Sequence, residues 1–172
     1  MKPGSPQMSS STNAGSSAFA IAKELYNRIP RLSKLNLHKL LFFIQAEHLA
    51  WYGNPAFTES IEAWENGPVV ADIWHDRPSR GARSRSIPQD LDNVMRSVVA
   101  RFRGTRGNNL VALVHEEGPW VEATECGTVI SNQIITHEAM REYAQQLPKE
   151  LEPIREALKD HPRDRPFVAD PR

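Results

Sequence analysis

The side chains that could hold a metal ion in this chain are six histidines and their acidic neighbours. The histidines are His38, His48, His75, His115, His137 and His161. No two of them have the i,i+4 spacing that brings two imidazoles onto one helix face, and none lies in a Cys/His cluster. The densest local group is His115, Glu116 and Glu117. We interpret this group as a helix end, where a histidine interacts favourably with the helix dipole, and we expect no metal site.

The other residues with catalytic potential are a cysteine and pairs of carboxylates. Cys126 is the one cysteine, so it has no disulfide partner within the chain, and no protease-type signature surrounds it. Glu62 and Glu65 are three residues apart, a spacing that is more typical of a solvated face than of an acid–base pair. No glycine-rich phosphate-binding loop is present. The sequence therefore predicts neither an enzyme nor a cofactor-binding protein.

Positive charge is concentrated between residues 77 and 106, although the formal net charge of the chain is zero. Eight arginines stand in this window against two acids, Asp90 and Asp92, which gives the window a formal charge of +6. The arginines are Arg77, Arg80, Arg83, Arg85, Arg96, Arg101, Arg103 and Arg106. Guanidinium groups suit both phosphates and carboxylates. The window could be a solvated loop and helix face, could meet an acidic protein surface, or could follow a nucleic-acid backbone.

Four tryptophans are the other side chains suited to binding a partner. They are Trp51, Trp64, Trp74 and Trp120. We interpret them first as core or rim-of-core residues, with interface anchoring as the alternative because tryptophan is enriched in binding hot spots. If Trp64 is core, its replacement by alanine should lower the free energy of unfolding by about 3–5 kcal/mol. If it anchors an interface, binding should be lost with little change in stability.

The elements that position these side chains are predicted to be mainly helical, because apolar residues recur at helical spacing. The segments with this pattern are residues 19–29, 36–52, 69–74, 91–102, 110–115, 136–147 and 151–158. The segment 36–52 is apolar on nearly all sides, so we expect it to be the buried centre of the domain. A turn is expected at residues 65–68, and Pro68 is expected to open the short helix that follows, where its missing N–H costs nothing.

The predicted fold class is therefore mainly α, an irregular or orthogonal bundle of about six or seven helices, with room for a small β hairpin near residues 57–66. Residues 1–16, rich in Ser, Gly and Pro, are expected to be a disordered tail. Residues 17–160 are expected to form a single helical domain, and residues 161–172, with three prolines, a loose tail.

The composition also bears on where the protein works. A single cysteine fits a reducing compartment. The N-terminus has no apolar signal region, and no apolar run approaches the roughly 18 residues of a membrane span. The sequence therefore predicts a soluble cytoplasmic protein with no membrane partner.

Two blocks of the sequence have a recognisable pattern. The first is NLHKLLFFIQAEHLAWYGNPAF (36–57) followed by IEAWENGPVV (61–70), and the second is LVALVHEEGPWVEA (110–123). Together they resemble the Panacea domain, the family of SocA-like antitoxins that also includes GepA-like phage-associated proteins, over about residues 19–147. The matching positions include Leu37, Lys39, Leu40, Gln45, Trp64, Gly67, Pro68, Val69, His115 and Trp120. The chain departs from the family pattern at His38, where Gln is common, and at Phe42, where Tyr is common.

The resemblance implies an antitoxin that neutralises a co-encoded toxin by direct protein–protein binding, or that acts as an adaptor delivering the toxin to a AAA+ protease. It also implies that the matching positions are mostly scaffold. Partner recognition is then expected beside them, because loops vary while scaffolds persist. The candidate partner-binding residues are Arg77, Arg80, Arg83, Arg85 and Trp74. The alternative function is that of a nucleic-acid-binding transcriptional regulator that uses the arginine-rich surface 77–106.

Overall fold

The computed structural model describes residues 17–76, 78, 87–102, 118–124 and 133–147. This part of the chain contains five α-helices, one 3₁₀ helix and three short strands. They are α1 (Ala18–Arg28), α2 (Lys34–Tyr52), β1 (Glu62–Trp64), β2 (Gly67–Val69), η1 (Ala71–Ile73), α3 (Gln89–Phe102), α5 (Pro119–Ala123), β3 (Gln133–Ile134) and α6 (His137–Gln146). The mainly helical prediction is confirmed, whereas the number of six or seven helices is not. The segments expected to be helical at 110–115 and 151–158, and both expected tails, lie outside the described residues.

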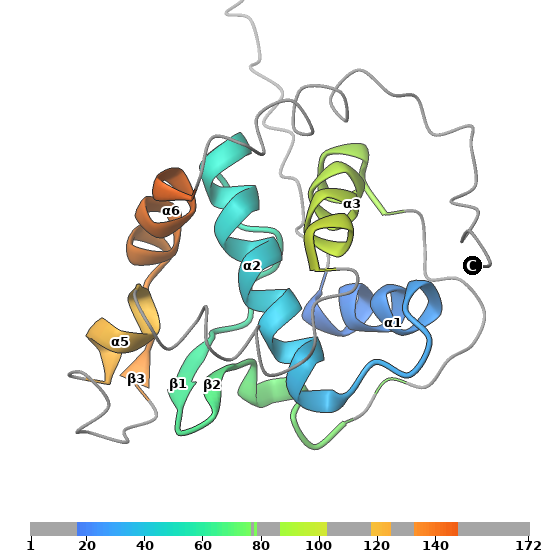
Figure 1. Cartoon of the computed structure of the whole chain (residues 1–172), viewed down its shortest axis with the longest axis horizontal. Helices are drawn as coiled ribbons and strands as arrows, with labels where there is room; N and C mark the ends of the chain where they lie inside the picture. Colours follow the sequence, from blue (N-terminus) through green and yellow to red (C-terminus); the bar gives the residue numbers. More distant parts are fainter. Residues whose placement is uncertain (1–16, 77, 79–86, 103–117, 125–132, 148–172) are drawn as a thin grey trace, which may run out of the picture.

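Helix α2 runs through the centre of the molecule, with α6 on one side and α1 and α3 on the other (Figure 1). All its residues from Leu37 to Leu49 are buried. The Ser33 hydroxyl caps its start by accepting a hydrogen bond from the backbone N–H of Asn36 at 3.2 Å, which satisfies one of the amides that a helix start leaves without an intrahelical partner. Gly53 ends the helix with a φ of 75°. The expected central helix over residues 36–52 is therefore confirmed.

The amphipathic helices α1 and α3 pack on α2 through one apolar stripe each. In α3 the buried apolar residues recur at helical spacing within the expected segment 91–102, and they are Leu91, Val94, Met95, Val98 and Val99. In α1 the buried residues include Ala18 and Ile21, whereas Phe19, expected within the stripe, is 43 % exposed. Neighbouring positions on a helix differ by about 100° in direction, so Ala18 and Phe19 cannot both face the core. In this structure the smaller Ala18 is buried and Phe19 is exposed.

Residues 61–70 contain a β hairpin, and this corrects the expected local structure. Strand β1 pairs antiparallel with β2, with Trp64 opposite Gly67 and Ala63 opposite Pro68. Pairs in an antiparallel ladder alternate between bonded and non-bonded, and the pair that flanks a two-residue turn is bonded. Pro68 therefore occupies a non-bonded position, where its missing N–H costs no ladder hydrogen bond.

The helix expected over residues 69–74 is consequently wrong. Only a single 3₁₀ turn, η1, follows the hairpin. A small hairpin near residues 57–66 is present, and its second strand lies beyond that range, at Gly67–Val69. The three residues of each strand are too few for an alternating pattern to stand out in the sequence, which explains why a helix was expected over 69–74.

The third strand and the last helix complete the small sheet and its cover. Strand β3 pairs antiparallel with the other edge of β1, so the strand order is β2-β1-β3. Thr136, the first residue of the expected segment 136–147, caps α6, because its hydroxyl accepts a hydrogen bond from the backbone N–H of Ala139 at 3.2 Å. The short helix α5 was not predicted, and it begins with Pro119, a residue favoured at a first helical position.

Candidate protein-binding site

The matching residues of α2 and β2 mainly build the scaffold. Leu37, Leu40 and Val69 are each at most 2 % exposed and belong to the core around α2. Pro68 is buried as well, in the strand that faces α2. Gly67 has a φ of 109°, a conformation that favours glycine, and it thereby allows the chain to return from the turn into β2. His115 lies outside the described residues.

Gln45 fastens the loop after α2 to the helix. Its side-chain oxygen accepts hydrogen bonds from the backbone N–H groups of Ala56 at 2.8 Å and Phe57 at 3.2 Å. Its amide nitrogen donates to the carbonyl of Phe57 at 3.0 Å and contacts Nε2 of His137 at 3.2 Å. A buried amide with this many partners is fully satisfied. Gln45 therefore holds the loop at residues 56–57 and the start of α6 in fixed positions on α2.

His38 joins α2 to the end of the hairpin. Its Nδ1 accepts a hydrogen bond from the backbone N–H of Val70 at 3.1 Å, so the ring proton is on Nε2. Burial, with a smaller contribution from the positive charge of Lys34, lowers the pKa of His38 to about 4. The imidazole is therefore neutral at physiological pH and acts as a hydrogen-bond acceptor in the scaffold.

The tryptophans of the hairpin region form a layer outside the core. Trp64 and Trp74 are both half-buried, with ring centroids 5.2 Å apart. Trp74 also contacts the His38 ring at 5.0 Å, and the Lys34 ammonium lies 4.0 Å from the centre of the Trp74 ring. Trp120 is buried and donates from its indole N–H to the carbonyl of Trp64 at 2.8 Å.

Among the residues that match the family pattern, Lys39 has the least expected environment. Its side chain is fully buried. Among the described residues, no group accepts a hydrogen bond from its ammonium. Burial lowers the pKa of Lys39 to about 8. The burial of Lys39 could have been predicted from the sequence, because its segment, 36–52, is apolar on nearly all sides.

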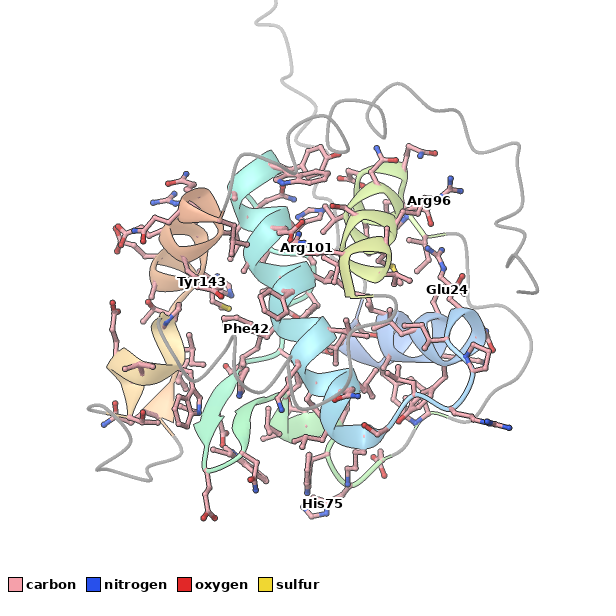
Figure 2. The ribbon with its side chains drawn as sticks, in the orientation of Figure 1. Glu24, Phe42, His75, Arg96, Arg101 and Tyr143 are labelled. Carbon is pink, nitrogen blue, oxygen red and sulfur yellow. The ribbon has the colours of Figure 1, made fainter. Side chains whose placement is uncertain are left out.

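Two arginines of the positive window, both in α3, are held by carboxylates of the protein itself. Arg96 pairs with Asp92 at 2.8 Å within α3. Arg101 extends from α3 towards α2 (Figure 2) and forms an ion pair with the buried Glu47. Both guanidinium groups are therefore engaged with carboxylates of the protein. The four arginines expected to bind a partner, Arg77, Arg80, Arg83 and Arg85, lie outside the described residues.

The described part of the chain offers neither a metal site nor a membrane span. Within it, no group of three or more His, Cys, Asp or Glu side chains is placed to hold a metal ion. None of its helices is long and apolar enough to cross a membrane.

Comparison with known proteins identifies one family. Residues 37–121 match the family described as Antitoxin SocA-like, Panacea domain. This range contains α2 from Leu37 onward, the hairpin, α3 and the start of α5, and it is narrower than the range 19–147 of the sequence resemblance. No curated protein and no solved structure matches the chain.

Proposed function

Residues 37–121 of this chain belong to the Panacea domain family of SocA-like antitoxins, and on that basis we propose that the protein neutralises a co-encoded toxin by binding it directly. The family match is the observation that carries this proposal. The buried polar groups of α2 support it, because the partners of Gln45 and His38 are scaffold groups. A neutralising protein needs a stable surface for its partner and does not need a reaction centre, so we also propose that it is not an enzyme.

Co-expression with the product of the neighbouring reading frame tests the proposal. That product alone should arrest growth, and co-expression of this chain should restore it. The two proteins should also co-purify. A neighbouring product that is harmless, or a growth arrest that this chain does not relieve, would contradict the proposal.

Delivery of the toxin to a AAA+ protease is a distinct mode of neutralisation, and toxin abundance separates the two. If binding alone neutralises the toxin, growth should recover while the amount of toxin stays unchanged. If the chain is an adaptor, the amount of toxin should fall, and a host that lacks the protease should lose the rescue.

The described arginines give the transcriptional regulator little support, since Arg96 and Arg101 are engaged with Asp92 and Glu47. A regulator of its own promoter should bind that DNA with an affinity that falls steeply as salt increases. The same preparation of the protein can be used for this measurement and for toxin binding.

A further inference from the structure

One face of β1 carries a large aromatic side chain that is half-buried. In this strand Ala63 is fully buried, while its neighbours Glu62 and Trp64 are half-buried. Successive side chains of a strand point to opposite faces. Ala63 therefore lies on one face of the sheet, and Trp64 lies on the opposite face together with Glu62 and the buried Val69, which pairs with Glu62.

The two indoles on this side of the molecule are held in fixed positions. The Trp64 N–H donates to the Glu62 carboxylate at 2.8 Å, and the Trp64 carbonyl accepts from Trp120 at 2.8 Å. Trp74 is held between Trp64, His38 and the Lys34 ammonium. Aromatic side chains that are ordered before binding lose little conformational entropy on binding, which makes them effective anchors. We call Trp64 and Trp74, with Glu62 and Lys34, the tryptophan shelf.

The segment 62–76, which contains both tryptophans of the shelf, is acidic, and the arginine-rich window begins directly after it at Arg77. Residues 62–76 contain four carboxylates and no Lys or Arg. Three of the four, Glu65, Asp72 and Asp76, are exposed, and none of these three forms an ion pair among the described residues. Asp72 and Asp76 stand two residues before and after Trp74. Figure 2 shows His75, which lies between Trp74 and Asp76 in the chain, at the outer edge of the molecule near the start of α2.

We propose that the tryptophan shelf, with Glu65, Asp72 and Asp76 at its rim, is the face that binds the toxin, and that it receives a basic segment of that protein. This inference rests on the proposed antitoxin function. Charge complementarity selects the occupant, because a lysine or arginine can pair with the rim carboxylates while its side chain packs on an indole. The same carboxylates repel the phosphates of a nucleic acid.

Neutralisation of the rim tests the charge part of the inference. The triple variant Glu65→Gln, Asp72→Asn and Asp76→Asn removes three exposed charges and keeps the Trp64–Glu62 hydrogen bond. Its affinity for the purified product of the neighbouring reading frame should fall about tenfold or more, mainly through slower association. The affinity of the wild-type chain should weaken with added salt, and that of the variant should depend less on salt.

A matched control removes the same amount of charge elsewhere. The triple variant Glu122→Gln, Glu138→Gln and Glu142→Gln changes three exposed carboxylates on α5 and α6. It should bind the same protein within about twofold of wild type, because isolated surface charges outside an interface contribute little.

A conservative change in the shelf tests the aromatic part. Trp64→Phe keeps an aromatic ring while it removes the indole N–H and part of the contact area. It should weaken toxin binding about tenfold, with a melting temperature close to that of the wild type. Trp51→Phe, at a half-buried tryptophan of α2, is the control and should leave binding unchanged.

The outcomes separate this inference from the proposed function. If the wild-type chain binds and neutralises the toxin while both the rim variant and Trp64→Phe match it, the toxin binds elsewhere and the inference is overturned. Equal losses in the rim variant and the α5–α6 control would show a general effect of net charge and would also overturn it. If the wild-type chain neither binds nor rescues, the proposed function and the inference fail together.

Discussion

Nδ1 of His38 in the central helix accepts the backbone N–H of Val70, immediately after the hairpin, at 3.1 Å. The two residues are 32 positions apart in the chain, and the bond fixes the hairpin against α2. The bond requires that Nδ1 carries no proton. Protonation of this buried ring therefore breaks a contact between two parts of the scaffold.

The first prediction is that acid destabilises the protein through His38. The pKa is about 4 in the folded state against an ordinary value of 6.5, so the unfolded chain takes up the proton first. The stability that the neutral ring contributes is complete above pH 6.5 and is lost as the pH falls from 6.5 towards 4, by about 3 kcal/mol in all. Urea unfolding across this interval measures the loss.

Substitutions identify the residue responsible. His38→Gln retains an acceptor for Val70 and should make the free energy of unfolding less dependent on pH in this range. His75→Gln, the same change at an exposed histidine, should behave as wild type. Identical pH profiles for the wild type and His38→Gln would contradict the assignment.

The second prediction concerns Lys39, whose burial lowers its pKa from 10.5 to about 8. Below pH 8 its charge is present in both the folded and the unfolded state, and the folded state bears the cost of desolvation. Lys39→Met should therefore raise the free energy of unfolding near neutral pH, by about 1–3 kcal/mol. The wild type should gain stability as the pH rises from 8 to 10.5, so the difference should shrink across that range.

Chemical denaturation at several pH values checks this prediction. Lys23→Met, at a partly buried lysine of α1, is the control and should have a smaller effect. A clear loss of stability in Lys39→Met at neutral pH would show that the ammonium has an acceptor, and the prediction would then be wrong.

The third prediction is that Gln45 contributes more to stability than His137, the side chain that its amide nitrogen contacts. Gln45→Met should lower the free energy of unfolding by about 3 kcal/mol, because it leaves the N–H groups of Ala56 and Phe57 without their buried acceptor. His137→Ala removes one contact at an exposed residue and should cost less than about 1 kcal/mol. Equal effects of the two substitutions in urea unfolding would refute this role for Gln45.

The fourth prediction compares two glycines with positive φ. A Cβ on Gly53 would meet nothing within 4 Å, whereas one on Gly118 would lie 2.8 Å from the ring of Tyr143. Gly53→Ala should therefore cost about 1 kcal/mol for backbone strain alone. Gly118→Ala adds a steric clash to the strain and should cost about 2–4 kcal/mol. Thermal unfolding ranks the pair, and a milder effect at Gly118 would contradict the packing of α5 on α6.

The features that could be predicted from the sequence are those with long local patterns. The central helix α2 follows from the segment 36–52, which is apolar on nearly all sides and has a glycine after its end. The stripe of α3 and the Thr136 cap of α6 are local patterns of the same kind. The paired blocks at 36–70 and 110–123 also indicate the family from the sequence alone, because the residues that match it stand in the same order in two separate blocks.

Features that depend on contacts between residues far apart in the chain could not be predicted from the sequence. Arg101 is committed to Glu47, 54 positions away, although its own neighbourhood in the sequence is typical of a basic surface. The stretch IEAWENGPVV became a hairpin because β3 supplied a second edge partner for β1 and because α2 covers β2. Short strands gain their stability from such cross-chain contacts. The same pairing buries Ala63 and leaves Trp64, on the opposite face of β1, half-buried, and the order of amino acids alone does not predict which of the two faces is the more buried.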